Sequence, residues 1–460
     1  MNSVFRDLLK LDRYPVKLFG AEVPDKGIAS ISIDSRTIKP GEVYFALKGE
    51  NQDGHRFVQA ALEKGAAAVV VSESFWHDAQ AGLEGYAVFV VDDTLRALQA
   101  FANAYRRKFD LPVIALTGTN GKTTTKEMIA AVLALSGEVC KTVGNFNNHI
   151  GLPLTLFGLE EKHDFLVVEM GANHFEEITA LCEIAEPQFG LITNIGHGHT
   201  EFLQDIKGVA KAKMELFHYL RHDGVVFANL DDPMIAKNAA RFKNKVTYGF
   251  TDDADIVGEN ARMDGRGFPV MQIDGEVVRL NVAGVHNLSN ALAALAVGKQ
   301  FGLTVAQMRE ALENIHLPSK RMEVLRRGTV TILNDSYNAN PESTMAALQT
   351  LSKFTAARRK IFVLGDMLEL GEQATEQHAR IGKALPQFHI DVFYAYGPLA
   401  AEALTAAQAT GKKIIARHFE HKDDLAAALK AEMQPHDVLL IKGSRGMKME
   451  DVLTTLFPAK

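Results

Sequence analysis

The sequence has few of the features that mark secreted, membrane-spanning or disulfide-rich proteins. Only two of its 460 residues are cysteines, Cys140 and Cys182. That count excludes a disulfide framework, and we expect two reduced thiols. No apolar run approaches the roughly 20 residues that cross a bilayer, and the N-terminal segment interleaves charges with apolar residues, unlike a signal peptide. These absences predict a cytoplasmic protein without a membrane span.

An excess of basic residues is also missing. The chain carries 50 Lys and Arg against 56 Asp and Glu, so its formal net charge is −6. Proteins that bind duplexes usually carry a basic excess, so we expect no nucleic-acid partner. Hydrophobic residues make up 47% and charged residues 23% of the chain, which is ordinary for globular domains with buried cores.

The length predicts about three domains of roughly 100–200 residues each. Proline-containing segments that interrupt helices and strands, Asp110–Pro112 and Leu317–Ser319, predict domain boundaries. The predicted domains are residues 1–110, 111–317 and 318–460. Apolar runs of strand length alternate with helical patterns, which predicts α/β folds with parallel sheets. We expect a smaller N-terminal α/β domain, a central P-loop-type mononucleotide-binding domain and a C-terminal Rossmann-like domain. The strands expected in the first domain are 29–33, 43–46, 67–71 and 87–91, and those in the third are 330–333, 360–364, 391–396 and 437–441.

A phosphate-binding loop is predicted at residues 117–124, T-G-T-N-G-K-T-T. An expected strand at 113–116 enters it, and an expected helix from Thr123 to about Leu135 leaves it. The helix start supplies backbone N–H groups and positive potential. Lys122 can reach the β- and γ-phosphates of ATP, and the Thr123 hydroxyl can bind Mg²⁺. Leu116 stands where the general P-loop pattern has glycine. The nucleotide-binding residues predicted here are Gly118, Thr119, Asn120, Gly121, Lys122, Thr123 and Thr124.

The loop resembles that of the Mur ligase superfamily, which also contains folylpolyglutamate synthase. Five further segments resemble motifs of one branch of that family: residues 144–153 (G-N-F-N-N-H-I-G-L-P), 168–173 (V-E-M-G-A-N), 334–341 (N-D-S-Y-N-A-N-P), 364–371 (L-G-D-M-L-E-L-G) and 440–446 (L-I-K-G-S-R-G). The resemblance extends from Asp34 to Arg445. It implies a monomeric ATP-dependent ligase that adds D-alanyl-D-alanine to UDP-N-acetylmuramoyl-tripeptide through an acyl phosphate, in the synthesis of peptidoglycan precursors. It leaves open which residue is third in the tripeptide.

The resemblance also implies two Mg²⁺ ions and a catalytic set of Lys122, Glu169, His199 and Lys213. Thr123 and Glu169 would bind one ion, and Glu169, His199 and Lys213 the other. Glu169 follows an expected strand at 165–168, and carboxylates at the carboxyl ends of parallel strands face the ligand crevice. Only His199 fits the family pattern, because His197 falls on a spacer position. The alternative for His199 is that it contacts a metal ligand and does not bind the metal itself. Lys213 matches a lysine carbamylated by CO₂ in this superfamily.

The remaining implied contacts lie along the whole chain. Asn287 and Asn290 share one face of an expected helix from 287 to about 297 and would contact adenine, although capping of that helix is an equal alternative for Asn287. Arg321 would contact phosphate and Asp335 the ribose. The UDP-linked substrate would meet Ser35, Arg36, Asn147, Asn148 and Thr193, and the dipeptide would meet Asn338 and Asn340. For the first-domain segments 34–36 and 53–55, a simple turn is the alternative.

Two other classes of protein stay open from the sequence. One is another ligase of the superfamily, such as folylpolyglutamate synthase, against which the segments 145–153 and 335–341 argue. The other is a P-loop switch protein gated by nucleotide, which would need no substrate domain on each side of the loop.

Overall fold

The structure is a computed structural model that describes residues 14–21, 28–198, 200–264 and 267–458. The chain divides into two compact units. The first contains the described residues up to 113 together with 140–170 and 179–187, and the second contains 114–139, 171–178 and the described residues from 188 onward. The three domain boundaries expected from the sequence stay predictions.

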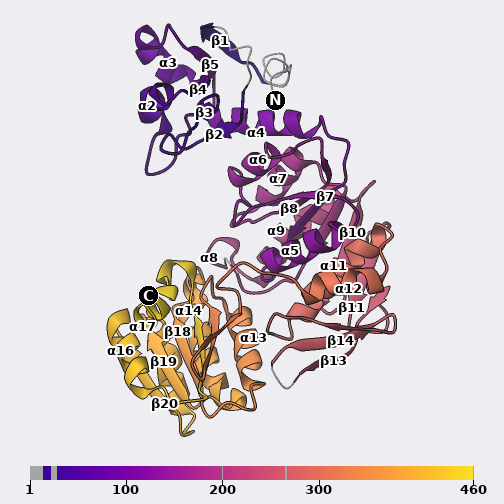
Figure 1. Ribbon diagram of the computed structural model, residues 1–460, viewed down its shortest axis with the longest axis vertical. Helices are drawn as coiled ribbons and strands as arrows, with labels where there is room; N and C mark the ends of the chain where they lie inside the picture. The colour runs from indigo at the N-terminus through magenta and orange to yellow at the C-terminus, as the bar shows by residue number, and fades with distance from the viewer. Residues whose placement is uncertain (1–13, 22–27, 199, 265–266, 459–460) are drawn as a thin grey trace. The chain divides into compact units, whose positions relative to one another are not determined.

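The N-terminal part of the first unit is built on a five-stranded sheet with the order β1-β5-β4-β3-β2 (Figure 1). Strand β1 is antiparallel to β5, and the other pairs are parallel. The elements are β1 (Lys17–Gly20), β2 (Ile31–Ser32), β3 (Val43–Phe45), η1 (Gly54–Phe57), α2 (Val58–Glu63), β4 (Ala68–Ser72), α3 (Glu73–Ala79), η2 (Gln80–Gly82), β5 (Ala87–Val91) and α4 (Thr94–Arg106). Strands β4 and β5 are rich in valine and almost wholly buried, as expected of parallel strands covered on both faces.

Helix α4 begins one residue earlier than its apolar pattern predicts, because Asp93 caps it. The Asp93 carboxylate accepts hydrogen bonds from the backbone N–H groups of Leu95 (2.8 Å) and Arg96 (3.0 Å). Two of the unpaired donors of the first turn are thereby satisfied. Strand β8 (His163–Glu169) and helix α6 (Gly151–Leu156) also belong to the first unit, which therefore contains residues on both sides of the phosphate loop in sequence.

In the second unit, strands β12, β11, β10, β9 and β6 lie side by side in that order, and all are parallel. The segment 251–274 was expected to form strands outside the core. Strands β13, β14 and β15 do form a separate antiparallel sheet, but Val270, Met271 and Ile273 of β14 are buried core residues. Besides α6 and β8, the strands and helices between 113 and 313 are β6 (Val113–Thr117), α5 (Lys122–Leu133), β7 (Glu138–Lys141), α7 (Glu177–Ala185), β9 (Phe189–Ile192), α8 (Thr200–Leu203), α9 (Ile206–Tyr219), β10 (Val225–Asn229), α10 (Pro233–Ala239), β11 (Lys245–Gly249), β12 (Ile256–Val257), β13 (Glu259–Met263), β14 (Pro269–Ile273), β15 (Glu276–Arg279), α11 (Asn287–Gln300) and α12 (Val305–Glu313).

The C-terminal sheet has six strands in the order β16-β17-β21-β18-β19-β20, with only β16 antiparallel to its neighbour. The elements are β16 (Glu323–Arg327), β17 (Val330–Asp335), α13 (Pro341–Ser352), β18 (Lys360–Gly365), η3 (Gly371–Gln373), α14 (Ala374–Ala384), η4 (Leu385–Phe388), β19 (Val392–Tyr396), α15 (Ala400–Ala409), β20 (Ile415–Phe419), α16 (Lys422–Glu432), β21 (Val438–Lys442), η5 (Arg445–Met447) and α17 (Glu450–Leu456).

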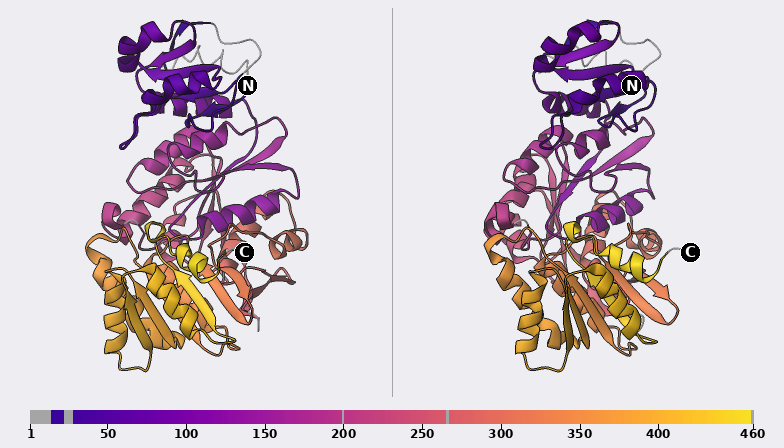
Figure 2. Two further views of the ribbon diagram at one scale, coloured as in Figure 1. Left: turned by 60° about the vertical axis from the view of Figure 1, so that its left-hand side comes forward. Right: turned by 90° about the vertical axis from the view of Figure 1, so that its left-hand side faces the viewer.

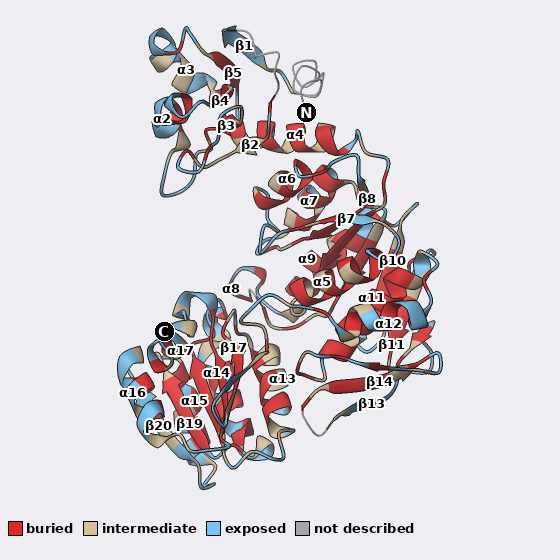
Figure 3. Cartoon of the chain, in the orientation of Figure 1, coloured by how far each residue is buried: buried red, intermediate tan, exposed pale blue. Residues whose placement is uncertain are grey.

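Helices cover both faces of this sheet (Figure 2). Phe362 and Leu364 of β18 belong to the core shared with α13, α14 and α15, whereas Ile361 and Val363 belong to the core shared with α16 and α17. The alternation follows from the two-residue repeat of a strand. The inner strands β21, β18 and β19 are buried almost throughout, whereas the edge strands β16 and β20 and the outer helix faces are partly exposed (Figure 3). This is the doubly wound α/β arrangement that the sequence predicts.

Among the described residues, no helix is both long and apolar enough to span a membrane.

Candidate active site

The phosphate loop occupies the turn between β6 and α5, and two glycines make its path possible. Gly118 has φ 140° and Gly121 has φ 80°, both in the region that favours glycine. A Cβ on Gly118 would lie 2.0 Å from the Thr193 hydroxyl oxygen, and one on Gly121 would lie 2.5 Å from the Asn290 amide oxygen. The loop backbone therefore packs directly against two polar side chains, and neither glycine can be replaced without a shift.

Lys122 places a cation at the start of α5. Its Nζ atom donates to the backbone oxygens of Gly118 (2.8 Å) and Thr119 (3.2 Å), so the amine lies over the loop. Thr123 and Thr124 follow within the first turn and are buried. A cation and a helix N-terminus together make a site for an anion such as phosphate.

The segment after β9 braces the loop from one side. The Thr193 hydroxyl donates to the Asn120 backbone oxygen (2.6 Å), which also accepts from the Asn194 amide (2.9 Å). The Asn120 N–H donates to the Asn194 amide oxygen (2.9 Å). Thr193, predicted to contact substrate, is thus bonded to the loop in this structure. Asn194 was missed by the sequence reasoning, although its place directly after a strand end was a usable signal.

Lys213 lies on α9 and is only 2% exposed. Its Nζ atom donates to the Ala172 backbone oxygen at 3.1 Å. Burial and, after it, the positive charge of Lys122 lower the pKa of the Lys213 amine, Glu177 and Glu215 act in the opposite direction, and the resulting pKa is about 7. Lys211, two residues earlier, is exposed, as expected for a solvated position. A substantial fraction of the Lys213 amine is therefore neutral near pH 7, unlike that of an ordinary lysine.

Glu169 ends strand β8 in the first unit, as predicted, and is 2% exposed. Its Oε1 atom accepts a hydrogen bond from the Asn147 amide at 2.8 Å, so the structure brings these two predicted residues together. Asn148 has a different environment: its amide oxygen accepts from the backbone N–H groups of Ile150 and Gly151 and holds the start of α6.

His199 lies outside the described residues. Among the residues that are described, no three or more His, Cys, Asp or Glu side chains converge to hold a metal ion. The predicted ligands within them offer a hydroxyl, a carboxylate and an amine. Oxygen ligands suit Mg²⁺, whereas the amine of unmodified Lys213 does not. The residue set fits Mg²⁺ only if Lys213 gains an oxygen.

Asn287 and Asn290, predicted to contact adenine, are both buried in α11. The Asn290 amide donates to the Asn287 oxygen (2.9 Å), and the Asn287 amide donates to the Ala283 backbone oxygen (2.7 Å). The Asn290 oxygen accepts from the Thr125 hydroxyl of α5 (3.1 Å). The alternative that Asn287 caps its helix is wrong, because α11 begins at Asn287 and His286 occupies the cap. Here the two amides join α11 to the helix that follows the loop.

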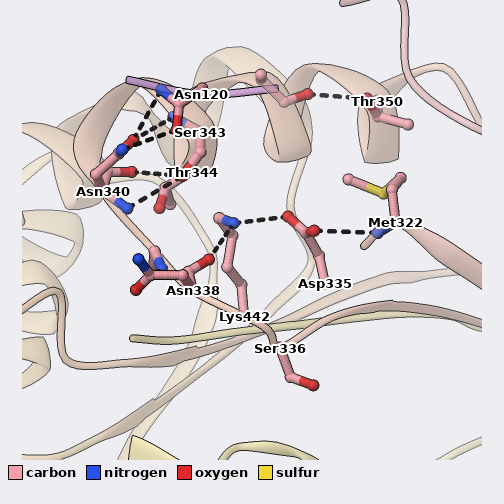
Figure 4. A network of polar contacts seen from close by, with 12 residues as sticks. Asn120, Met322, Asp335, Ser336, Asn338, Asn340, Ser343, Thr344, Thr350 and Lys442 are labelled. Atoms are coloured by element: carbon pink, nitrogen blue, oxygen red, sulfur yellow. Dashed lines mark hydrogen bonds and ion pairs between the residues drawn. The ribbon is translucent and has the colours of Figure 1, made fainter. Parts of the chain in front are cut away.

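Asp335 stands at the end of β17, and both of its oxygens have partners. One forms an ion pair with Lys442 Nζ at 2.6 Å, and the other accepts from the Met322 N–H at 3.0 Å (Figure 4). Lys442 is 2% exposed and also donates to the Asn338 backbone oxygen. The segment 440–446 was singled out in the sequence, but its lysine was not. Sequence position could not show that its partner lies more than 100 residues away.

Two further predicted residues occupy the start of the C-terminal part. The Arg321 guanidinium lies 3.8 Å from the centre of the Tyr337 ring, a cation–π geometry. Asn340 caps α13 by accepting from the Ser343 N–H (2.9 Å), and its amide donates to the Asn120 amide oxygen of the phosphate loop (2.8 Å), as Figure 4 shows. Asn338 accepts from the Ala339 N–H.

The N-terminal segments have local explanations. The exposed Arg36 guanidinium pairs with Asp34 at 2.7 Å, which lowers the pKa of that carboxyl to about 2. Ser35 is buried. His55 is buried as well; its Nδ1 lies 2.6 Å from Asp53, and its Nε2 accepts from the Ser72 N–H. The segment 34–36 lies in a turn closed by the Thr37 N–H and the Asp34 backbone oxygen (3.3 Å), whereas Asp53 caps the short helix η1 that follows it.

Three family models match successive parts of the chain. Residues 116–298 match the family model described as Mur ligase middle domain, and residues 320–445 match Mur ligase, glutamate ligase domain. Residues 27–106 match Mur ligase family, catalytic domain. Together these matches cover well over half of the chain.

Several relatives that match over most of their length carry the same name. The UDP-N-acetylmuramoyl-tripeptide–D-alanyl-D-alanine ligase of Bacillus subtilis is 38% identical over 93% of this chain and 93% of its own length. The Escherichia coli protein of that name is 33% identical over 96% and 95%. Among solved structures, MurF from Acinetobacter baumannii superposes with a TM-score of 0.87 at 28% identity, covering 98% of both chains. MurF from Thermotoga maritima in complex with ADP gives 0.81 at 28% identity, covering 94% of this chain and 98% of that one.

Proposed function

The chain belongs to the Mur ligase family, and from that membership we propose that it is an ATP-dependent ligase joining D-alanyl-D-alanine to UDP-N-acetylmuramoyl-tripeptide. The observation that carries this proposal is the phosphate loop at the start of α5, with Lys122 held over it by two backbone oxygens. The relatives' names supply the substrates, and their similarity extends over more than nine-tenths of both chains.

In the proposed reaction, the γ-phosphoryl group of ATP passes to the terminal carboxylate of the tripeptide. The amine of D-alanyl-D-alanine then attacks the acyl phosphate, and the tetrahedral intermediate collapses to an amide and inorganic phosphate. Lys122 and the N-terminus of α5 stabilise the negative charge that moves between the phosphates. Mg²⁺, when bound, would neutralise phosphate charge; the residues proposed to hold it are Thr123, Glu169, His199 and Lys213.

We propose that Lys213 acts as a carbamate. A neutral amine can attack CO₂: an N–C bond forms, the nitrogen loses one proton, and an anionic carbamate with two oxygen ligands results. Two features of Lys213 favour this. Burial lowers the pKa of its amine so that a substantial fraction is neutral near pH 7, and the nearby cation Lys122 repels a protonated Lys213 but would attract a carbamate. Hard Mg²⁺ prefers such an oxygen anion to an amine.

The other assignments are proposals of the same kind. We propose that Asn287, Asn290, Arg321 and Asp335 serve the adenosine and phosphate end of ATP, and that Ser35, Arg36, Asn147, Asn148 and Thr193 serve the UDP-linked substrate. Asn338 and Asn340 would serve the dipeptide. A monomer acting in the cytoplasm on small-molecule precursors of peptidoglycan completes the proposal.

Phosphate release from ATP tests the function. The proposed ligase should release phosphate at full rate only when both UDP-N-acetylmuramoyl-tripeptide and D-alanyl-D-alanine are present, and the ligated product should accumulate in equal amount. Lys122→Ala should remove both. A nucleotide-gated switch would instead hydrolyse ATP slowly whatever peptide is added, and that result would sink the ligase assignment.

For Lys213, the test is Lys213→Ala with and without short-chain carboxylic acids, which can enter the space left by the side chain and supply the missing carboxylate. Recovery of activity with the acids supports the carbamate. An unmodified Lys213 in the metal-loaded wild-type protein, together with failure of every acid to restore activity, would count against it.

A further inference from the structure

The segment Gly196-His197-Gly198 lies between the phosphate loop and the first turn of α13. On one side, the Gly196 N–H donates to the Thr119 hydroxyl at 2.9 Å. On the other side, the His197 N–H donates to Glu342 Oε2 at 2.9 Å. The family pattern leaves His197 as a spacer, but in this chain it joins the loop region to a helix of the C-terminal sheet.

The contact between His197 and Glu342 has two points. Besides the backbone bond, His197 Nδ1 lies 2.6 Å from Glu342 Oε1. A carboxylate can only accept, so Nδ1 is the nitrogen that carries the proton in this contact. Each carboxylate oxygen thus holds one donor of the same residue, which fixes both the backbone and the ring of His197. Hydrogen bonds to a charged group are stronger than neutral ones.

The two glycines make this close approach possible. A Cβ on Gly196 would lie 3.1 Å from Glu342 Oε2, and a Cβ on Gly198 would lie 2.8 Å from the Thr119 methyl group. Neither glycine has a positive φ. What matters at these positions is therefore the absence of a side chain, not backbone freedom. The segment 196–198 fits between the phosphate loop and α13 because the residues on both sides of His197 are small.

The same turn of α13 makes a second contact, between Asn340 and the phosphate loop. Asn340 is fixed by its capping box with Ser343, and its amide pairs with the amide of Asn120 in the phosphate loop. The first turn of α13 therefore holds both the loop and the segment that braces it. A first-turn carboxylate also stabilises a helix through its dipole, but that role needs no partner at His197.

We propose that Glu342 and His197 form a clasp that positions the phosphate loop for the ligation step. This inference rests on the proposed function, in which the C-terminal part contributes dipeptide-binding residues. Through this contact, binding by the C-terminal part also orders the phosphate loop. The nucleotide and the dipeptide amine are then in place together when the acyl phosphate forms. Glu342 and His197 are positioning residues, because neither touches a reacting group in this scheme.

The test compares Glu342→Ala, His197→Ala and the double variant in the full-length enzyme. We expect each single variant to lower kcat about tenfold, the scale of one hydrogen bond to a charged group, with the KM for the UDP-linked substrate unchanged. Glu342→Ala removes both points of the contact, whereas His197→Ala keeps the bond from the backbone N–H. The double variant should therefore lose no more than Glu342→Ala alone. Glu342→Gln, which keeps an accepting oxygen, should recover part of the loss.

Hydrogen exchange of the amides in 117–124, measured by mass spectrometry without substrates, gives a second readout independent of activity. Exchange should rise in both single variants. Asp424→Ala is the matched control, since Asp424 is an exposed first-turn carboxylate of α16, and it should change neither readout. Losses that multiply in the double variant, or unchanged exchange in the loop, would overturn the clasp. A wild-type protein that ligates nothing would instead overturn the proposed function.

Discussion

Replacement of Lys213 by methionine tests the burial of its amine through the pH dependence of stability. Methionine has similar length and no charge, so the variant keeps much of the packing and removes one titrating group. In the folded protein the pKa of Lys213 lies at about 7, against 10.5 for an ordinary lysine. Between these values the unfolded chain holds a proton that the folded chain has released. The wild-type free energy of unfolding therefore rises with pH across that window.

The size of the effect follows from the two pKa values. One unit of pKa shift corresponds to about 1.4 kcal/mol, so an unmodified Lys213 costs the folded state about 4 kcal/mol at pH 7 and about 2 kcal/mol at pH 9. The wild type should gain about 2 kcal/mol relative to Lys213→Met over those two pH units. All other groups titrate alike in both proteins and cancel in the difference.

Urea unfolding at several pH values, in buffers free of metal and CO₂, measures this difference. Added bicarbonate should then alter the wild-type curve and leave the variant unchanged, because only the wild type has an amine that can form a carbamate. Parallel curves for the two proteins from pH 7 to pH 9 would show that Lys213 keeps an ordinary pKa. The burial argument for carbamylation would then fail with them.

Three further substitutions probe the loop, the C-terminal ion pair and a helix cap. Gly121→Ala should raise the KM for ATP and lower stability by about 1–3 kcal/mol, combining left-handed strain with a clash against α11; Gly275→Ala, with φ 79° and open space around it, should show the strain alone. Lys442→Met should cost about 3–5 kcal/mol in urea unfolding because it strands a carboxylate, and adding Asp335→Asn should recover part of it; a double variant as unstable as the single one would refute the pair. Asp93→Ala should lower the free energy of unfolding by about 1 kcal/mol in the same assay. An unchanged urea midpoint would show that the cap does not stabilise the protein.

The elements of the fold follow largely from local sequence. The valine-rich run at 87–91 marks a strand that the structure contains with the same ends, and the apolar period from Leu95 marks a helix that begins one residue earlier. The shift comes from the cap Asp93, whose effect on a boundary depends on backbone geometry as well as composition. The shape of the phosphate loop was likewise readable, because glycine and lysine at fixed spacing act within one turn of chain.

Long-range partners were not readable in this way. The sequence marked Asn290 and Asp335 as nucleotide contacts, yet in the structure Asn290 lies under Gly121 and Asp335 pairs with buried Lys442. The sequence also set His197 aside, whereas the structure bonds it to Glu342. Each of these contacts joins residues far apart in the chain, and no local pattern records which distant side chain will arrive.

The sequence by itself determined the alternation of strands and helices, the place of the phosphate loop and the family, because each of these depends on residues close together or on motifs kept whole. Only the tertiary structure decided that Lys213 is buried with a lowered pKa, and that the first turn of α13 holds the loop through Asn340 and Glu342. Burial sets the local dielectric, and the meeting of distant side chains sets which charges are paired. Both are properties of the folded chain, and the chemistry proposed for Lys122 and Lys213 depends on them.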